Sequence, residues 1–517
     1  MNASTSGNDK KQLIKRLDFP LTFIPFISIV ALCVIFIKFP EASSTVLQAL
    51  RSFLSDTFSA FYLLIGLGAF LVSIYIAFSK YGKIKLGNDK KPQFSFFAWG
   101  SMMFTAGLAA DILFYSLCEW ILYAKEKHIS ELGNMQTWAS TYPLFHWGPI
   151  PWSFYLILAS AFGFMLHVKK CKRQRYSEAC RPVLGKFADR LPGKLIDITA
   201  VFALIAGTAT TFSLATPLLS SAISKVFGIA QTNLLTITLL VIICIIYTVC
   251  AYFGLKGVEL LASSCTYIFF ALLLYVLIGG GKARYIIETG ISSIGNLVNN
   301  FFVLSTYTDS ARENGFVQDW TVFYWAYWIV WCVATPFFIG SISRGRTLKQ
   351  TVIGGYVFGL SGTFTSFIIL GNYGLGLEIL DKVNITGFYE KTADIYQTIL
   401  IFDKLPFPNI VLVLLVLAMI AFYATTFDSL TIVAASYSYN DLTSDETPDK
   451  RVKLFWAVLL ILFPITLIFS GKSMENLQTV SIIAAFPVGI IIVLIIAGFF
   501  KDASEYLARS KDYPENQ

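Results

Sequence analysis

Aromatic side chains with the chemistry to hold a soft cation are concentrated at residues 324–331, which read Tyr-Trp-Ala-Tyr-Trp-Ile-Val-Trp. Three tryptophans and two tyrosines fall within these eight residues, inside an apolar segment. On a helix, Tyr324, Trp328 and Trp331 share one face because they follow the spacing i, i+4 and i+7. Such a stripe is either a bulky packing surface or one side of a site for a quaternary ammonium ion, which aromatic faces attract.

A second aromatic group lies at residues 145–155 and contains Trp147, Trp152 and Tyr155. Two prolines in this stretch forbid a straight helix, so these three rings could turn toward one point. An aromatic belt at the membrane interface is the alternative explanation. The depth of the first aromatic stripe in its apolar segment favours a box of aromatic faces that binds a quaternary ammonium ion. His146 is expected to be a hydrogen-bonded structural residue and not a proton relay.

Asp111 is the most informative polar residue, because it lies in the middle of an apolar stretch. A carboxylate at mid-span costs about 2.5–3.5 kcal/mol on insertion scales and is seldom kept there without a function. It could bind and release a coupling proton, or it could act as the counter-ion of a cationic substrate. The alternative is a structural aspartate that is hydrogen-bonded to a neighbouring span. For Glu119 and Asp428 we favour membership of a structural network.

The composition predicts a polytopic membrane protein. The chain has 517 residues, of which 56% are hydrophobic and 14% charged, whereas soluble proteins are about 25% charged. The net charge of +8 is interpreted as a topology signal and not as a sign of nucleic-acid binding. The cysteines lack C-x-x-C spacing, and no nucleophile–base set or metal cluster is recognisable. We therefore expect no enzyme activity, no metal and no cofactor.

Twelve segments are long and apolar enough to cross a bilayer, which takes about 20 residues. The expected spans are Phe19–Ile37, Phe58–Phe78, Phe94–Tyr123, Tyr142–His167, Ile196–Ile223, Leu234–Phe253, Val258–Gly279, Trp320–Ile342, Thr351–Leu370, Ile410–Ala434, Lys453–Phe469 and Val480–Phe499. The stretch Tyr285–Leu304, about 285–304, mixes apolar residues with Asn, Ser and Gly and is expected to be an interfacial helix. Residues 1–18 and 500–517 are expected to be short tails around a transporter domain at 19–499.

Lysine and arginine in the short loops predict the orientation. Those assigned to one side are Lys10, Lys11, Lys15, Arg16, Lys80, Lys83, Lys85, Lys90, Lys91, Lys169, Lys170, Lys172, Arg173, Arg175, Arg181, Arg344, Arg346, Lys349, Lys450 and Arg451. The opposite loops are much poorer in basic residues, so both termini are expected to be cytoplasmic. We expect a multi-pass protein of the inner (plasma) membrane without a cleavable signal peptide.

Several expected spans contain small or hydroxylated residues at mid-segment. They are Gly107 in the third span, residues 207–211 in the fifth and residues 425–429 in the tenth. Small residues commonly allow tight helix packing in membranes. Local unwinding around a site at the membrane midplane is the alternative. Because the third and tenth segments each have an acidic residue beside them, we favour unwinding there.

These residues together resemble the betaine/carnitine/choline transporter (BCCT) family. The eighth span of the family contains W-x-W-W-x-x-W followed by R-I-S-R-G-R; here residues 325–331 read Trp-Ala-Tyr-Trp-Ile-Val-Trp, and residues 341–347 read Ser-Ile-Ser-Arg-Gly-Arg-Thr. The aromatic stretches 145–147 and 151–155 and the Thr-Thr-Phe-Asp-Ser run at 425–429 are similar to further family patterns. The resemblance covers essentially the whole chain.

The resemblance implies two inverted five-helix repeats, here about 94–280 and 320–499, preceded by two extra helices. It also implies a homotrimer that works by alternating access. The substrate box would be formed by Trp147, Trp152, Tyr155 and Trp328, with Trp331 near the other end of the substrate. Tyr327 stands where the family has a tryptophan, and we expect packing or the substrate pathway for it. The candidates for the coupling ion or its support are Asp111, Thr208, Thr211, Thr425 and Thr426.

Three departures from the family pattern bear on the substrate and the coupling ion. The third-span pattern, close to G-M-G-I-G, reads Gly-Leu-Ala-Ala-Asp at 107–111, and members with an acid here resemble proton-coupled choline carriers. Sodium-coupled members of the family have one sodium site that uses two threonines of the fifth span; here Leu204 takes the first of these positions and only Thr208 remains. Thr425 and Thr426 match the hydroxyls of the family's other sodium site. The Glu-Pro of the family is Glu119-Trp120 here, for which we have no functional account.

The sequence therefore predicts a secondary transporter that imports a quaternary ammonium compound, with choline as the expected substrate, by proton symport through Asp111. Choline carries a net positive charge and would be drawn to the carboxylate, whereas the carboxylates of zwitterions would be repelled. A sodium-coupled or exchange carrier of glycine betaine, carnitine or a related zwitterion is the first alternative. A membrane sensor that binds such a ligand without moving it is the second.

Overall fold

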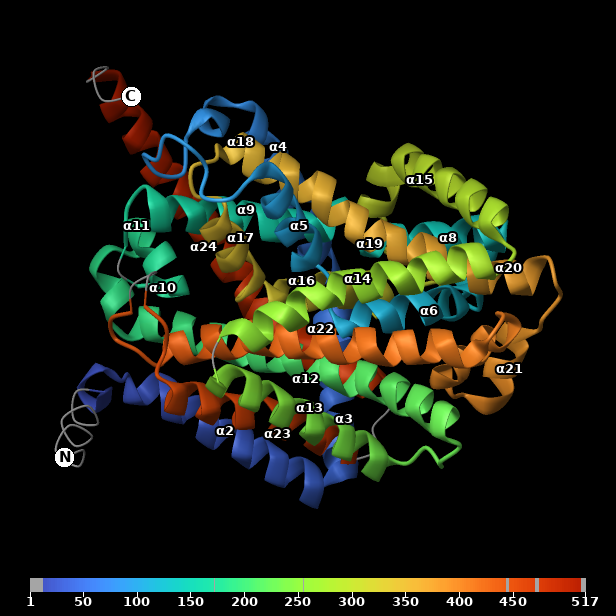
Figure 1. Ribbon diagram of the computed structural model, residues 1–517. Coiled ribbons are helices and arrows are strands. Elements are labelled where there is room, and N and C mark those ends of the chain that lie inside the picture. Colours follow the sequence, from blue (N-terminus) through green and yellow to red (C-terminus); the bar gives the residue numbers. More distant parts are fainter. Residues whose placement is uncertain (1–12, 172, 254, 443–445, 470–473, 513–517) are drawn as a thin grey trace.

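The computed structural model describes residues 13–171, 173–253, 255–442, 446–469 and 474–512, and Figure 1 shows its course. The described part of the chain is almost entirely helical, and its only strand-like pairings are two isolated bridges, Leu17 with Tyr439 and Lys85 with Thr347. Long helices run side by side through the molecule, and α22 and α12 lie centrally among them (Figure 1). The predicted all-α, polytopic architecture is thus confirmed.

The bundle is built from long helices and from shorter helices that continue one another. In chain order they are α2 (Phe19–Lys38), α3 (Pro40–Thr57), α4 (Ser59–Phe78), α5 (Phe96–Ala106), α6 (Ala110–Ala124), α8 (Met135–His146), α9 (Pro149–His167), α12 (Leu191–Phe227), α13 (Asn233–Phe253), α14 (Leu255–Gly279), α15 (Ala283–Thr306), α16 (Val322–Trp331), α17 (Thr335–Ile342), α18 (Leu348–Gly354), α19 (Leu360–Ser366), α20 (Asn372–Ile379), α22 (Pro408–Tyr437), α23 (Lys450–Phe469) and α24 (Met474–Asp512). Short helices connect them, namely α7 (Lys127–Glu131), α10 (Tyr176–Ala179), α11 (Arg181–Leu184) and α21 (Ile385–Thr392).

Each of the twelve expected spans falls on a helix or on a broken helix. Among the described residues, eight helical segments are long and apolar enough to cross a membrane, and three bent pairs raise the number to eleven. The expected sixth span is α13, whose apolar described part, Asn233–Tyr247, is shorter. The ninth runs from Leu348 to Ile379 through α18, α19 and α20, with π-helical stretches between them.

Two spans break near the middle of the molecule. The first break lies between α5 and α6 at residues 107–109, with a bend of 58°, where the sequence indicated unwinding. The second lies between α16 and α17 at residues 332–334, with a bend of 54°. The sequence predicted one span here, Trp320–Ile342, but gave no indication of this break. Pro336, in the first turn of α17, is the local cause because it lacks an N–H for the preceding turn.

The unwinding expected in the tenth span, and considered as an alternative in the fifth, is absent from both helices. Helix α12 continues through residues 207–211, and α22 continues through residues 425–429. The threonines fit inside these helices because their hydroxyls donate to carbonyls of their own helix; Thr208 bonds to Leu204 at 2.7 Å. In place of a break, Gly207 lets α16 come close, since a Cβ there would lie 3.1 Å from Val330. Packing through small residues was therefore the correct interpretation.

Further differences concern the amphipathic segments and the C-terminus. Helix α15 turns by 111° from α14, so it does not prolong that span. Helix α3, which the sequence interpretation missed, lies between the first two spans. Helix α24 runs on to Asp512, so residues 500–512 continue the last span as helix and do not form a separate tail.

The basic loops gather at one end of the bundle, which we call the basic end. Helix α2 begins and α24 ends there (Figure 1). Within it, Leu86 donates its backbone N–H to Arg346 at 2.8 Å, and Leu348 donates to Ile84 at 2.9 Å. Arg344 pairs with Asp89 at 2.7 Å. These bonds fasten the 84–94 loop, which leads into α5, to the end of α17. Lys10, Lys11 and Lys172 of the predicted basic side lie outside the described residues.

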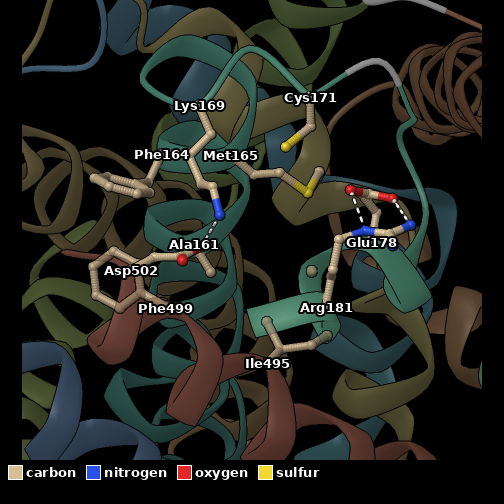
Figure 2. Close-up of a pocket in the computed structure, with 11 residues that line it drawn as sticks. Ala161, Phe164, Met165, Lys169, Cys171, Glu178, Arg181, Ile495, Phe499 and Asp502 are labelled. Atoms are coloured by element: carbon tan, nitrogen blue, oxygen red, sulfur yellow. Dashed lines mark hydrogen bonds and ion pairs between the residues drawn. The ribbon is translucent and has the colours of Figure 1, made fainter. Parts of the chain in front are cut away.

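A small hollow at the basic end lies between α9, α11 and α24 (Figure 2). Lys169 reaches Asp502 at 2.6 Å on one side, and Arg181 forms two 2.8 Å bonds to Glu178 on the other. Its volume of about 20 Å³ is room for about one water. The Lys169–Asp502 pair ties α24 to the loop that follows α9, and the Arg181–Glu178 pair stays within the segment after that loop; we therefore do not interpret the hollow as a ligand site.

Candidate functional site

A cavity of about 580 Å³ opens beside the two helix breaks. It runs from the α5–α6 break toward the basic end, between α9, α17 and α22. The residues that line it are Met102, Thr105, Ala106, Gly107, Leu108, Ala109, Asp111, Trp147, Tyr155, Leu166, His167, Gln174, Cys265, Tyr327, Trp328, Trp331, Ala334, Thr335, Phe337, Phe338, Ser341, Phe422, Thr425, Thr426, Asp428, Ser429, Leu430, Ile432 and Val433. All three residues of the α5–α6 break line it, and the rest of the lining is mostly apolar.

Trp328 is the centre of the aromatic cluster beside this cavity. Its ring centroid lies 4.8 Å from Tyr155, 5.6 Å from Trp147 and 5.8 Å from Trp152, and all three planes are tilted against it. Such tilted contacts leave ring faces free to turn toward a guest. The rings come from α9, from the residue at the end of α8 and from α16, so the cluster exists only because these segments cross. The four residues that the sequence predicted as a box are thus neighbours.

The four aromatic residues do not all reach the cavity. Trp147, Tyr155 and Trp328 line it, as does Trp331. Trp152 is fully buried behind them and lies against two glycines. A Cβ on Gly107 would come within 2.3 Å of the Trp152 ring, and one on Gly359 within 2.4 Å. Trp152 therefore supports the cluster from behind in this conformation, and Gly107 is required by close packing as well as by the helix break.

Asp111 lies in the first turn of α6, directly after the break, and is 4% exposed. Its Oδ1 accepts the backbone N–H of Ile112 at 3.0 Å. Its Oδ2 accepts a hydrogen bond from the Tyr327 hydroxyl, which is also bonded to the Thr211 hydroxyl. The N-terminal turn of a helix favours a negative charge. Tyr327 thus holds the carboxylate in place, and the expectation that it serves packing or the pathway was incomplete.

The candidate hydroxyls for a coupling ion fall into two groups. Thr425 and Thr426 line the cavity on α22, which is unbroken along their stretch. Thr208 and Thr211 are fully buried on α12 and lie behind the lining. Thr211 reaches the site only through its bond to Tyr327. The structure therefore connects Thr211 to Asp111 but leaves Thr208 bonded within its own helix.

Glu119 belongs to a fully buried hydrogen-bond network behind Trp147, as the sequence interpretation favoured. It accepts the Trp147 indole N–H at 2.8 Å and a hydrogen bond from the Tyr123 hydroxyl. The Tyr123 oxygen is 2.6 Å from His146 Nδ1, and His146 Nε2 is 3.0 Å from the Thr321 hydroxyl. The pairing of Glu119 with Trp147 was not foreseen, because nothing local marks two residues 28 apart as partners.

The charged side chains that line the cavity are mainly acidic. Asp111 and Asp428 contribute carboxylates, and none of the described residues that line the cavity is a lysine or arginine. His167 is the one basic side chain there, and its Nε2 is already 3.0 Å from the Gly340 carbonyl. An apolar cavity with aromatic faces and acidic side chains favours a cation that cannot donate hydrogen bonds.

Comparisons with known proteins agree with this chemistry. Residues 20–508 match the model of the BCCT family, described as the betaine/carnitine/choline family transporter. The chain is 30% identical over 475 residues to the glycine betaine transporter OpuD of Bacillus subtilis, covering 90% of each chain. It is 25% identical over 480 residues to a carnitine transporter of Acinetobacter baumannii, covering 92% of this chain and 86% of that one. The chain therefore belongs to the betaine/carnitine/choline transporter family, a family of multi-pass membrane transporters.

Proposed function

We propose that this transporter imports choline, a quaternary ammonium cation, by proton symport. The observation that carries the proposal is the position of Asp111, whose carboxylate lines the same cavity as Trp147, Tyr155 and Trp328. The aromatic faces would attract the trimethylammonium group, and the carboxylate would balance its charge. We expect no cofactor for this function, because an ion gradient supplies the free energy for substrate accumulation.

A net cation fits the lining better than a zwitterion does. The two relatives are a glycine betaine and a carnitine transporter, and both of those substrates carry a carboxylate. A substrate carboxylate needs hydrogen-bond donors or a positive side chain, and the described lining offers no lysine or arginine. An ionised Asp111 would repel it further. Choline has a hydroxyl in place of the carboxylate and avoids this cost.

Proton coupling would use Asp111 as the group that changes charge. The ionised carboxylate attracts the cation into the site, and symport requires that Asp111 then take up a proton while the aromatic faces hold the cation, so that both cross together. The bonds from Tyr327 and Ile112 hold the carboxylate at the α5–α6 break, where a change in helix angle would move it relative to α16. We propose that α5–α6 and α16–α17, the first helices of the two proposed repeats (about 94–280 and 320–499), carry the alternation of access.

The remaining features of the proposal follow from the topology. We place the basic end in the cytoplasm, and with it both termini, in the inner (plasma) membrane. The cavity would then open toward the cytoplasm, because it reaches His167, Gln174 and Ser341 at that end. A homotrimer and an interfacial position for α15 are part of the same proposal.

The second candidate is sodium-coupled or exchange transport of a zwitterion. It is favoured by the names of the two relatives and by the hydroxyls of Thr425 and Thr426, which line the cavity. Oxygen atoms of this kind are sodium ligands. The two candidates differ in the driving ion and in the net charge of the substrate, so one assay can separate them.

The test is uptake into proteoliposomes that contain the purified wild-type protein. Radiolabelled choline, glycine betaine and carnitine are offered under an inward proton gradient alone and under an inward sodium gradient alone. We expect choline to accumulate under the proton gradient, and a protonophore to abolish the accumulation. Accumulation of betaine or carnitine under sodium alone would reject the proposal in favour of the second candidate. Binding without accumulation under either gradient would indicate a ligand sensor.

A further inference from the structure

The buried carboxylate of Glu119 has no part in the proposed function, although it touches the aromatic cluster directly. Its Oε2 accepts the indole N–H of Trp147 at 2.8 Å, and the Trp147 ring lines the substrate cavity. Glu119 itself is 0% exposed and does not line the cavity. Any influence of Glu119 on a substrate must therefore pass through the indole.

The hydrogen bonds behind Glu119 all point toward it. Tyr123 donates to Glu119, so the Tyr123 oxygen must accept from His146 Nδ1, 2.6 Å away. That proton on Nδ1 makes Nε2 the acceptor for the Thr321 hydroxyl at 3.0 Å in a neutral imidazole. Donors in such a chain polarise one another, and the charge ends on the carboxylate. His146 is thus hydrogen-bonded through both ring nitrogens, in keeping with the structural role that the sequence interpretation expected.

Glu119 lacks a strong counter-charge among the described residues. Its one partner at ion-pair distance is the His146 ring, at 3.9 Å, which is itself hydrogen-bonded to Tyr123 and Thr321. In its ionised form, the carboxylate accepts hydrogen bonds from the N–H of Trp147 and the O–H of Tyr123. A hydrogen bond to a carboxylate draws the N–H bond electrons toward the indole, which makes the ring face more negative. A more negative face attracts a cation more strongly.

We infer that Glu119 is a specificity-determining positioning residue. By accepting the indole N–H, it makes the face of the Trp147 ring more negative, so that the cavity favours cations over neutral molecules of the same shape. This inference rests on the proposed function, because it assumes that the aromatic cluster binds a quaternary ammonium group. It gives a role to Glu119, the part of the family's Glu-Pro pattern that this chain keeps, because the glutamate acts on the substrate through the indole of Trp147.

The test compares two ligands of one shape. Choline and 3,3-dimethylbutan-1-ol differ only in the central atom, which is a charged nitrogen in the first and a neutral carbon in the second. Their dissociation constants are measured by competition against radiolabelled choline on wild-type protein and on Glu119→Gln. Glutamine keeps the shape and an acceptor oxygen but removes the charge. We expect choline to bind about 3- to 10-fold more weakly to the variant, as for a partial loss of a cation–π contact, and the alcohol to bind equally to both proteins.

The matched control is Glu126→Gln. Glu126 accepts the indole N–H of Trp320 at 2.9 Å, which is the same chemical pair on a tryptophan that does not line the cavity. Its removal should leave the preference for choline over the alcohol unchanged. Thermal unfolding of each variant shows whether it folds.

A double-mutant cycle keeps the test decisive if Glu119→Gln is poorly folded or acts by moving the ring. Trp147→Phe removes the N–H that connects the ring to Glu119, so adding Glu119→Gln to it should not lower the preference for choline further. Glu119→Asp, which keeps the charge, should retain more of the preference than Glu119→Gln.

Three results would overturn the inference. If Glu119→Gln weakens the binding of choline and of the alcohol by the same factor, Glu119 only holds the cluster in shape. An unchanged preference would mean that its charge does not reach the cavity. If wild-type protein itself fails to prefer choline over the alcohol, the proposed function fails, and the inference fails with it.

Discussion

The hydroxyl of Tyr327 donates a hydrogen bond to the carboxylate of Asp111, across 216 residues of sequence. Tyr327 lies on α16 before its break, and Asp111 lies on α6 directly after the other break. The bond therefore joins the two broken helices close to the points where they change direction. Thr211 of α12 bonds to the same hydroxyl, so a third helix is tied to this junction.

Replacing Tyr327 with phenylalanine removes that bond and keeps the ring. A hydrogen bond to a charged group is worth about 1.5–3 kcal/mol, so proton-driven choline uptake should fall by about tenfold or more in Vmax/KM. The measurement is initial uptake in proteoliposomes at equal protein density. The control is Tyr62→Phe, whose hydroxyl bonds to the Ile482 carbonyl away from the cavity. Wild-type uptake in Tyr327→Phe would show that the bond is dispensable.

Replacing Asp111 with asparagine should abolish choline uptake driven by a pH gradient, because the amide cannot carry the proton. Uptake is measured with the gradient imposed and collapsed, and thermal unfolding confirms that the variant folds. Asp403→Asn, which breaks an ion pair with Lys225 outside the cavity, is the control. Unaltered gradient-driven uptake in Asp111→Asn would remove Asp111 from the coupling mechanism.

Replacing Trp328 with leucine removes the ring that touches the three other aromatic residues of the cluster. A desolvated cation–π contact is worth about 2 kcal/mol, so the dissociation constant for choline should rise about 30-fold or more. Calorimetric binding to purified protein measures this change. Trp138→Leu serves as the control, since that indole bonds to the Leu132 carbonyl and does not line the cavity. Equal affinities of wild type and Trp328→Leu would refute the aromatic site.

Replacing Gly107 with alanine should disturb the site through Trp152. The added Cβ would come within 2.3 Å of the Trp152 ring, and overpacking of this kind costs about 1–3 kcal/mol. Both the unfolding temperature and choline uptake should fall. Gly68→Ala on α4 is the control, because nothing lies within 4 Å of its Cβ. If both alanine variants behave alike, the contact with Trp152 is not tight in solution.

The loop before α12 should give the protein a small pH-dependent stability. Two hydrogen bonds from Arg181 hold the pKa of Asp189 well below its ordinary value, and Arg173 adds to the effect. A lowered carboxyl pKa stabilises the folded state above the ordinary value of about 3.9 and loses this contribution as the pH falls below it. Asp189→Asn should therefore lower the unfolding temperature by about 1–2 °C at pH 7, as expected for an exposed ion pair, and by less at pH 3. A difference that grows toward acid pH would contradict this sign.

The sequence predicted those features that local composition controls. Length and apolarity located the spans, and the small residues around Gly107 located the first break. The second break escaped notice because residues 332–334 are as apolar as their surroundings and the one cue, Pro336, lies beyond them. Residues 207–211 and 425–429 have small and hydroxylated side chains like those near the first break. They stay helical because a threonine hydroxyl can donate a hydrogen bond to a carbonyl of its own helix.

The pairings at the site could not be predicted in this way. Side chains such as Tyr327 with Asp111, or Glu119 with Trp147, meet because helices cross, and the direction of a side chain on a broken helix depends on the bend. For the same reason, the sequence indicated that Trp152 belongs to the aromatic cluster but not that it lies behind the cavity lining.

The fastening of the 84–94 loop to the end of α17 has a mechanical consequence. Leu86 and Arg346 are joined by a backbone hydrogen bond, and the Arg346 guanidinium lies 4.1 Å from the centre of the Trp99 ring in α5. The half-helices α5 and α17 are thus joined at the basic end, away from their breaks. We therefore expect a tilt of α5 to be transmitted to α17, so that the two halves move as one body.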